Sequence, residues 1–210
     1  MNMKVKEISH VLETFAPLSI QESWDNSGLI IGSPEQDVHG VLLGFDCTPE
    51  LVDEAVECGA DMIVTHHPLI FGGLKKISPD DPTGLAVMKA VSAGIAVYAA
   101  HTTADKVLSG VSGAMAERLG LENIGILDED PNGYGLGAIG DLPEAMGGEK
   151  FIEYVKSCFN LKVARCSRIP DVQISKVAMC GGSGASLIDV AKSLGAQAYL
   201  CGDISYHHFF

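Results

Sequence analysis

Short apolar runs of strand length alternate with helix-length segments along much of this chain, and this alternation constrains the fold more than any other feature. Strands are expected at 41–45, 62–65 and 95–100, and helices at 49–58 and 83–93. Neighbouring parallel strands need crossover connections of a dozen or more residues, usually containing a helix. The order therefore predicts βαβ units and an α/β fold with mostly parallel strands.

Local signals set the ends of these helices. Thr48 is a natural N-cap, because its side-chain oxygen can accept a hydrogen bond from the first turn, and Pro49 suits the first helical position. Gly59 and Gly94 end the two helices, because glycine readily adopts the left-handed conformation found there. A further amphipathic helix is expected at 4–15, where apolar residues recur at helical spacing.

The composition changes after Gly120. Residues 128–150 are rich in glycine, proline and acids, and they predict a long connection with one short strand. A helix at 151–159, a strand at 161–169 and a last βαβ unit at 176–203 are expected to follow. This change marks the boundary between two parts of the fold.

The predicted organisation is an N-terminal α/β lobe at 1–127 and a C-terminal α/β lobe at 128–210, which together form one compact unit. The last βαβ unit repeats an earlier one: at a constant offset of 136, residues 41–67 overlie 177–203 with six identities in 27 positions. Ligands of open α/β sheets bind beyond the carboxyl ends of the strands, so the two related lobes are expected to share a cleft between them. The glycine-rich stretch 181–184 is interpreted as a tight turn, with phosphate binding as the alternative.

Charge and targeting signals exclude several classes of protein. The formal net charge is −13, from 27 acidic and 14 basic residues. Nucleic acids need a basic surface, so none is expected as a partner, whereas cation binding is compatible with this charge. No apolar run is long enough for a signal peptide or a membrane span, which predicts a cytoplasmic protein without membrane contact. The six cysteines form no CxxC pair, which predicts reduced core thiols for most of them.

Two adjacent histidines, His66 and His67, follow the apolar strand 62–65 and precede a proline. Successive strand residues point to opposite faces, so the two imidazoles cannot share one core pocket. At the end of a strand they could instead reach two neighbouring metal ions. On spacing alone, metal binding and an ordinary structural role remain equally open for this pair.

His101 and Asp105 follow the next expected strand and therefore belong to the same rim of the sheet. Imidazole and carboxylate together suit zinc, manganese, iron or nickel. Two such ions about 3.5–4 Å apart can activate a bridging water and polarise a phosphoryl or carbonyl group. The alternatives are a hydrogen-bonded loop histidine for His101 and a helix cap or loop acid for Asp105.

Several segments of the chain together resemble one known family. They are ESWDNSGLIIG, LGFDCTPELVDEAVECGADMIVTHHPLIF, IAVYAAHTTADKVLSGVSGAMAERLGL, GLGAIGDL, and KVAMCGGSGASLI followed by GAQAYLCGDISYH. Over almost the whole chain they resemble the NGG-interacting-factor-three-like family, whose members are often labelled GTP cyclohydrolase I type 2 homologues. The resemblance implies a two-lobed α/β protein that forms a toroidal homohexamer, with paired metal ions in a metal cleft between the lobes. It also implies His66, His67 and Asp105 as metal ligands, with His101 beside them.

The chain departs from the family pattern in two places. The family's HTNLD motif stands here as HTTAD, which keeps His101 and Asp105. In the family a GHxxxE-type motif supplies a further histidine and a bridging glutamate, and the 210 residues end before such a motif. A shortened sequence and weak metal binding are the two interpretations. His207 and His208 fall at a YH position of the family and are expected to be neighbours of the site rather than ligands.

The sequence thus predicts a metal-dependent hydrolase that acts on a small molecule, a nucleotide or another phosphorylated compound. His66, His67 and Asp105 would hold two divalent transition-metal ions, and a metal-bound hydroxide would be the nucleophile. His101 would be the catalytic acid or base, or would orient a ligand. Ring-opening of GTP is implied only by the family label. Two alternatives stay open: a non-catalytic oligomeric metal-binding or regulatory scaffold, and a protein for metal storage or delivery.

Overall fold

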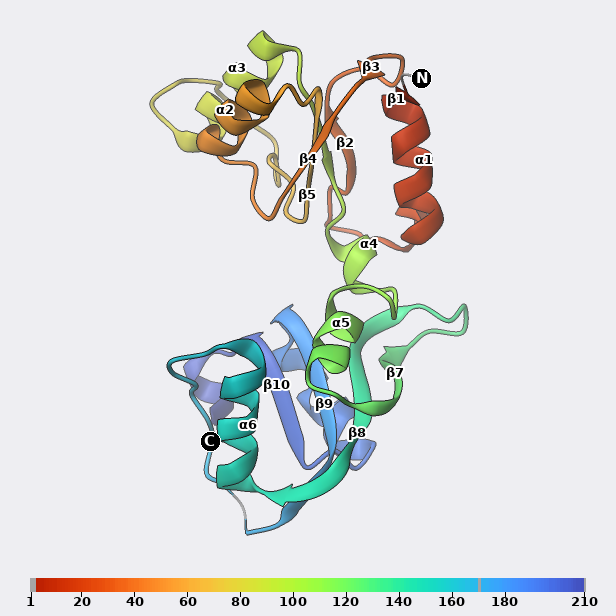
Figure 1. The fold of residues 1–210 in the computed structure, drawn as a ribbon, viewed down its shortest axis with the longest axis vertical. Coiled ribbons are helices and arrows are strands. Elements are labelled where there is room, and N and C mark those ends of the chain that lie inside the picture. The colour runs from red at the N-terminus through yellow and green to blue at the C-terminus, as the bar shows by residue number, and fades with distance from the viewer. Residues whose placement is uncertain (1–2, 170, 210) are drawn as a thin grey trace. The chain divides into compact units, whose positions relative to one another are not determined.

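The computed structural model describes residues 3–169 and 171–209, and the chain divides into two compact units, Met1–Ala104 and Asp105–Phe210. Each unit has its own four-stranded sheet flanked by helices (Figure 1), which confirms the α/β class. The division falls at Asp105, because the helix at 111–118 packs on the second sheet and the strand at 122–129 is part of it. None of the described helices is long and apolar enough to cross a lipid bilayer.

The first unit is built around the sheet β2–β6–β5–β4. Its elements are β1 (Met3–Lys4), α1 (Val5–Phe15), η1 (Leu18–Ile20), β2 (Gly28–Ile31), β3 (Asp37–Val38), β4 (Val41–Gly44), α2 (Pro49–Cys58), β5 (Met62–Thr65), α3 (Pro82–Ala93) and β6 (Ala96–Ala99). Strands β4, β5 and β6 are parallel, and β2 runs antiparallel to β6. The predicted βαβ order is therefore confirmed in this unit.

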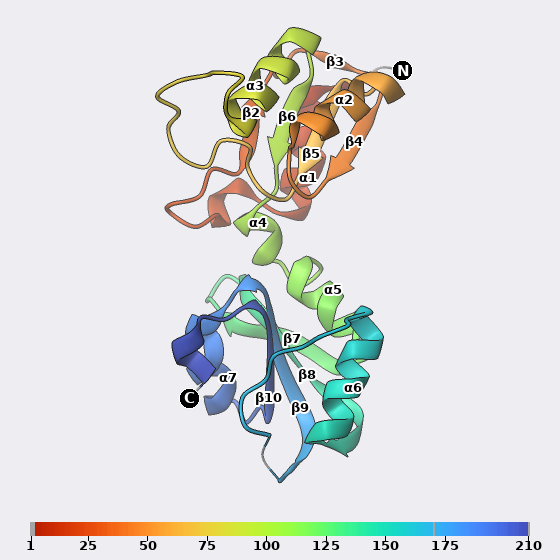
Figure 2. The ribbon, with the colours of Figure 1, turned by 90° about the vertical axis from the view of Figure 1, so that its left-hand side faces the viewer.

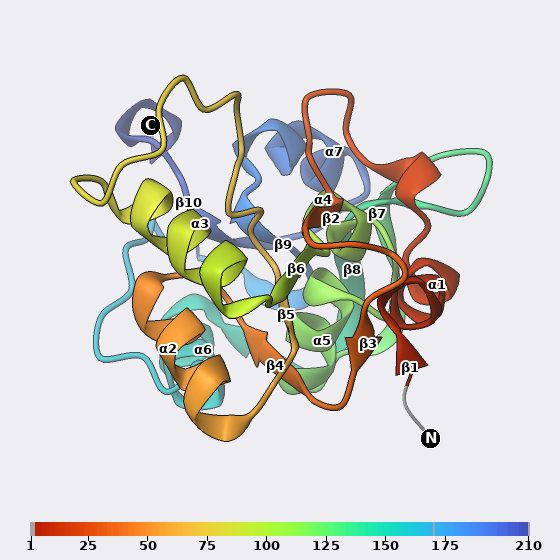
Figure 3. The same ribbon diagram turned by 90° about the horizontal axis from the view of Figure 1, so that it is seen from above.

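Helices cover both faces of the first sheet, as Figures 1 and 3 show, with α1 on one side and α2 and α3 on the other. Met62 and Val64 of β5 pack in the same cluster as Val5 of α1. On the opposite face, Ile63 packs with Val52 of α2. All residues of β5 and β6 are buried, as expected for parallel strands that are covered on both sides. Strands buried in this way offer only their ends for chemistry.

The predicted helix ends are confirmed. The Thr48 hydroxyl accepts a hydrogen bond from the Leu51 N–H at 3.2 Å, and Pro49 begins α2. Gly59 and Gly94 follow α2 and α3 with φ angles of +73° and +68°. The ends of α2 and α3 determine where β5 and β6 begin. They therefore also determine which residues stand at the carboxyl ends of these two strands.

The second unit is built around the sheet β10–β9–β8–β7. After α4 (Thr102–Asp105), where the units divide, its elements are α5 (Val111–Arg118), β7 (Glu122–Glu129), β8 (Gly135–Gly147), α6 (Gly148–Phe159), β9 (Gln173–Ser183), η2 (Ala185–Leu187), α7 (Ile188–Ser193), β10 (Ala198–Asp203) and η3 (Tyr206–Phe209). Helices α5 and α6 lie on one face and α7 on the other (Figure 2). Strands β7, β8 and β9 are antiparallel neighbours, whereas β9 and β10 are parallel. Mostly parallel strands are thus found in the first unit but not in the second.

Residues 128–150 are not the long connection that their composition predicts, because they contain the end of β7, a hairpin turn and all of β8. The glycines there allow close contact between strands. A Cβ at Gly135 would lie 1.9 Å from the Asp128 carbonyl oxygen, and one at Gly137, whose φ is +76°, would lie 2.9 Å from the Met179 carbonyl oxygen. Neighbouring backbones therefore require these glycines, and composition alone does not reveal this.

The strand predicted at 161–169 is also wrong. The segment has no regular secondary structure, and every residue in it is exposed, including Leu161, Val163 and Ile169. Alternating apolar residues form a strand only where a neighbouring strand supplies hydrogen bonds and a face to pack on. This segment pairs with no strand in the described part of the chain.

The two segments of the predicted repeat have the same local geometry. Both β4–α2–β5 and β9–α7–β10 are parallel βαβ units, and Val41 pairs with Met62 just as Val177 pairs with Ala198. Both members of the second pair are 136 residues after those of the first. Strand β9 continues through Ser183, so most of the expected glycine turn is strand. The two βαβ units therefore have residues 136 positions apart at the carboxyl ends of their corresponding strands.

Candidate metal centre

Three histidines meet at the carboxyl ends of β5 and β6. His66 and His67 follow β5 directly, and His101 follows β6 after one further residue. Thr65 and Ala99 are register partners in these parallel strands, so the residues after them emerge side by side. One ligand nitrogen from each histidine lies within 4.8 Å of the other two, and the ring centroids are 5.0, 5.3 and 5.4 Å apart. Among the described residues, this is the one group of three or more potential ligands that converges in this way.

Each of the three histidines has its Nδ1 within hydrogen-bonding distance of an oxygen. The pairs are His66 with the Ala100 carbonyl oxygen at 3.2 Å, His67 with Asp46 Oδ1 at 2.7 Å, and His101 with Asp25 Oδ1 at 2.7 Å. A neutral imidazole that donates from Nδ1 carries its lone pair on Nε2. Proteins commonly orient metal-binding histidines by this device, because the oxygen fixes both the tautomer and the direction of the ring.

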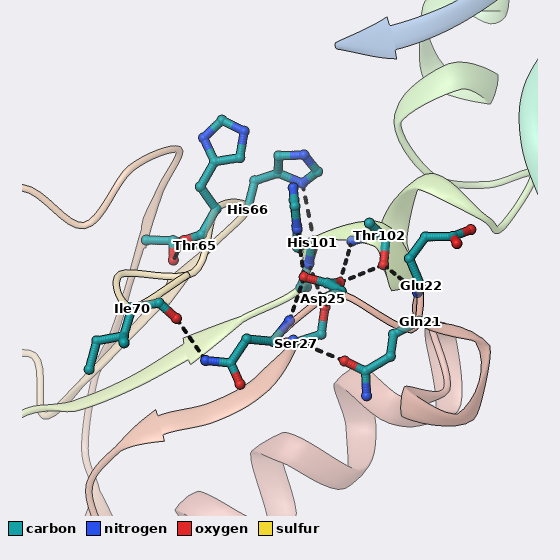
Figure 4. Close-up of polar contacts among 12 residues, drawn as sticks. Gln21, Glu22, Asp25, Ser27, Thr65, His66, Ile70, His101 and Thr102 are labelled. Carbon is teal, nitrogen blue, oxygen red and sulfur yellow. Dashed lines mark hydrogen bonds and ion pairs between the residues drawn. The ribbon is translucent and has the colours of Figure 1, made fainter. Parts of the chain in front are cut away.

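Asp25 receives several hydrogen bonds besides the one from His101 (Figure 4). Its buried carboxylate accepts from the Ser27 hydroxyl and the Asn26 N–H, each at 2.7 Å, and from the Thr102 hydroxyl and N–H. Burial by itself would raise the pKa of Asp25, but the hydrogen bonds from Thr102, His101 and Ser27 outweigh it and lower the pKa to about 2. The carboxylate is therefore charged at neutral pH and fixes the imidazole of His101 through its Nδ1.

Asp25 and Asp46 are not among the site residues that the sequence predicts. Asp46 follows β4, whose carboxyl end lies at the same rim as that of β5. The strand-end rule that selected the histidines therefore also applies to Asp46. Asp25 precedes β2, and because β2 is antiparallel to β6, the beginning of β2 lies at this rim. The direction of a strand in a sheet is not visible in a sequence pattern, so Asp25 carried no such signal.

Asp105, predicted as a metal ligand, is the last residue of α4 and the first residue of the second unit. The converging group contains His101, predicted as the acid or base, and does not contain Asp105. Burial, followed by the charges of Cys201 and Asp105, raises the pKa of the Cys180 thiol to about 11. The carboxylate of Asp105 thus acts electrostatically on a thiol of the second unit.

A cavity of about 600 Å³ opens beside His67 within the first unit. Its lining includes the carboxylates of Asp46, Glu50, Asp80 and Asp81 at the beginnings of α2 and α3. No lysine or arginine of the described residues lines it. Hydrogen bonds from its own backbone N–H and from Thr48 lower the pKa of Glu50, so this carboxylate is charged at neutral pH. The cavity therefore favours a cationic or neutral group over a phosphate.

The fold and the site together define a class: a two-unit α/β protein with a histidine cluster at the ends of parallel strands, each imidazole held by an oxygen. Comparison with known families agrees with this class. Residues 3–210 match the family described as Duf34/NIF3 (NGG1p interacting factor 3), and the chain belongs to this family. The resemblance seen in the sequence motifs is thereby confirmed.

Individual relatives are similar over nearly the whole chain. The GTP cyclohydrolase 1 type 2 homologs of Clostridium acetobutylicum and Clostridium perfringens are 34% and 35% identical to it. These alignments cover 99% and 98% of this chain and 79% of each relative. The crystal structure of a Bacillus cereus protein related to NIF3 matches with a TM-score of 0.92 at 28% identity, over 99% of this chain and 84% of that one.

Proposed function

We propose that this protein is a metal-dependent hydrolase that acts on a nucleotide or another phosphorylated small molecule. The observation that supports the proposal is the shared hydrogen-bond pattern of the three histidines, in which an oxygen holds each Nδ1. Because their ligand nitrogens converge within 4.8 Å, the cluster fits a divalent transition metal bound through Nε2.

In this proposal His66, His67 and His101 hold metal, and Asp105, four residues after His101, supplies a carboxylate. The family resemblance implies two divalent ions, and imidazole with carboxylate suits zinc, manganese, iron or nickel. When bound, such an ion supplies a Lewis acid and lowers the pKa of water. The chain's own contribution is to hold the three ligands in place before the metal arrives.

Asp25 and Asp46 are the positioning residues of this proposal. Each accepts from Nδ1 of one histidine at 2.7 Å, so each keeps the Nε2 lone pair of that histidine directed at the metal position. The charge of the carboxylate also makes Nε2 of the imidazole more basic, and hence a stronger ligand for the metal. Their removal should weaken metal binding without removing any ligand.

The substrate class rests on the relatives and is narrowed by the cavity. The two Clostridium relatives carry the name GTP cyclohydrolase 1 type 2 homolog, which suggests a nucleotide. The acidic lining beside His67 would repel the phosphate groups of a nucleotide. We therefore infer that the phosphates lie away from this cavity and that another part of the substrate approaches the histidines.

The proposal includes a cytoplasmic homo-oligomer, specifically the toroidal hexamer that the family resemblance implies. Light scattering of the purified protein tests the assembly. A mass of six chains supports the hexamer, and a stable monomer contradicts it.

Elemental analysis of protein purified without chelator tests the metal centre. We expect one to two transition-metal ions per chain, lost in His66→Ala, His67→Ala and His101→Ala. His39→Ala is the matched control, because Nδ1 of His39 also lies 2.9 Å from a carboxylate, that of Asp61, but outside the cluster. Metal that survives His67→Ala would contradict the site.

A nucleotide screen then tests the chemistry, with product formation compared between the wild type and His67→Ala at equal assembly state. Turnover that disappears in the variant supports a hydrolase. Metal binding without turnover of any nucleotide or phosphorylated compound would leave the non-catalytic scaffold as the function.

A further inference from the structure

Aromatic side chains surround the histidine cluster at the surface of the first unit. Five aromatic residues of the described chain are largely exposed: Phe15, Trp24, Phe45, Phe71 and Tyr206. Three of them, Trp24, Phe45 and Phe71, are in ring contact with the clustered histidines and are 56%, 64% and 56% exposed. We call these three residues the aromatic collar. Aromatic side chains are usually buried, so their concentration at this site needs a physical explanation.

The collar contacts all three imidazoles. Trp24 and Phe71 flank His101, with each ring centroid 5.9 Å from the imidazole centroid, and they are 5.7 Å from each other. Phe45 lies against the other two imidazoles, stacked on one at 5.3 Å and edge-on to the other at 4.6 Å. Apolar ring surface therefore lies against every imidazole of the cluster.

The collar is tied to the residues that orient the histidines. Trp24 directly precedes Asp25, and Phe45 directly precedes Asp46. In both places the carboxylate holds an imidazole through Nδ1 while the preceding aromatic ring contacts that same imidazole. The hydrogen-bonded carboxylate fixes the backbone beside each ring. The rings are thus held at the surface in defined positions, as a preorganised binding surface requires.

The chemistry of the surface restricts the ligand. Exposed aromatic faces favour a flat apolar partner, and the adjacent imidazoles favour a partner with lone-pair or proton-donating edges. An aliphatic chain has no such edge, and a phosphate has no such face. A phosphate would also be repelled by Asp46, Glu50 and the other carboxylates beside His67. A planar nitrogen heterocycle meets both requirements.

We propose that the aromatic collar is a stacking site for a purine-sized nitrogen heterocycle and places the edge of that ring at the histidine cluster. This inference deepens the proposed function and rests on it, because it makes the base the part of the substrate that this site recognises. Stacking on one aromatic side chain typically changes affinity about fivefold to 150-fold per base.

Trp24 makes the proposal directly measurable, because it is the only tryptophan in the chain. The fluorescence of the purified full chain is followed while guanosine or adenosine is added, with ribose 5-phosphate as the probe that lacks a ring. We expect saturable quenching by the nucleosides and none by ribose 5-phosphate. Equal responses to all three compounds would overturn the proposal.

Substitutions at the collar separate stacking from general apolar contact. Phe71→Ala should weaken nucleoside binding about fivefold to 150-fold, and Phe71→Leu should weaken it as well, because leucine is apolar but not flat. Phe15→Ala is the matched control, since Phe15 is an exposed phenylalanine on α1. Wild-type affinity in Phe71→Leu would overturn the proposal, because general apolar contact would then explain binding, and so would wild-type affinity in Phe71→Ala. Both positions are exposed, so all three variants should fold.

The same titration distinguishes this inference from the proposed function when it is run with and without Zn²⁺. Quenching by nucleosides in a protein that binds no Zn²⁺ would support the stacking site and contradict the metal centre. Zn²⁺ binding without quenching by any nucleoside would overturn the stacking site alone. A blue shift of Trp24 emission that grows with protein concentration would also overturn it, because a second copy of the chain would then cover the collar.

Discussion

The two βαβ units, β4–α2–β5 in the first compact unit and β9–α7–β10 in the second, have the same geometry. They differ in the side chains at the carboxyl end of the second strand. Both have the same strand register, and both helices are followed by a left-handed glycine, Gly59 at φ +73° and Gly195 at φ +81°. In the first unit, β5 is followed by His66 and His67, whereas the corresponding positions of the second are Gly202 and Asp203. The scaffold sets where residues emerge, and the side chains at that point decide what the rim can bind.

The neighbouring strand adds a second difference. In the first unit β6 is parallel to β5 and brings His101 to the same rim. In the second unit the counterpart of β5 is β10, which is the edge strand of its sheet, so no strand of the described residues lies where β6 lies in the first unit. A third ligand from the end of a neighbouring strand is therefore available in the first unit alone. Repeating the βαβ unit is not enough to repeat the site.

The largest effect is expected from giving the first rim the residues of the second, through the double substitution His66→Gly and His67→Asp. Two of three converging imidazoles are lost, so affinity for Zn²⁺ should fall by more than about 100-fold. Calorimetric titration measures the affinity, and circular dichroism checks that the fold is kept. The reciprocal variant, Gly202→His with Asp203→His, should gain no comparable site, because β10 is an edge strand and no described strand beside it supplies a third ligand. Tight zinc binding by that variant would break the comparison.

A smaller effect is expected from Asp25→Asn, which keeps the shape of the side chain and removes its charge. The imidazole of His101 then loses the partner that fixes its tautomer, and metal affinity should fall about 10- to 100-fold. Competition with a chromophoric chelator measures this change. Asp61→Asn is the control, because Asp61 holds the imidazole of His39 outside the cluster. Equal affinities in wild type and Asp25→Asn would show that ligand orientation contributes little.

Cys180, near the rim of the second unit, predicts a dependence of stability on pH. Burial is the main cause that raises the pKa of this thiol from about 9 to about 11. The folded protein thus holds the proton more tightly than the unfolded chain. The resulting stabilisation is complete below pH 9 and is lost as the pH rises to about 11, where the loss is about 2 kcal/mol. Urea unfolding between pH 8 and 11 should show a shallower decline in Cys180→Ala than in the wild type, and identical declines would contradict this assignment.

The smallest effect concerns how the two crossover helices begin. Helix α2 has the Thr48 cap, whereas α7 follows the 3-10 turn η2 and has no side-chain cap. Thr48→Ala should lower the free energy of unfolding by about 1 kcal/mol, because a first-turn N–H loses its acceptor. Chemical denaturation measures the change, and Thr48→Ser should retain most of the stability. No loss in Thr48→Ala would mean that water replaces the hydroxyl.

Elements that depend on local signals could be predicted from the sequence. Helix α2 begins and ends where Thr48 and Gly59 predict, and β5 has the predicted bounds 62–65. Both depend on residues that are adjacent in the chain. Strand β8 could not be predicted in this way, because its glycines are required by strands distant in sequence. The segment 161–169 shows the converse, since its β-forming residues have no strand to pair with.

The residues of the site likewise fall into those with a local sequence signal and those placed by contacts between distant parts of the chain. His66, His67 and His101 were selected because each follows an apolar run, a feature that can be read locally. Asp25 was missed because it meets His101 across 76 positions of sequence, through a strand whose direction no local pattern reveals. The ligands of a site are thus easier to find from sequence than the residues that hold those ligands in place.

The three histidines all lie in the first unit, at the ends of strands that are buried on both faces, so a bound metal would act on the stability of that unit. A metal that binds only the folded form adds about 2.7 kcal/mol of stability at a free concentration 100 times its Kd. Because all three histidines belong to the first unit, that free energy enters chiefly the folding equilibrium of this unit. Metal supply would then decide which half of the chain opens first to a protease, so the turnover of the protein would follow the metal status of its surroundings.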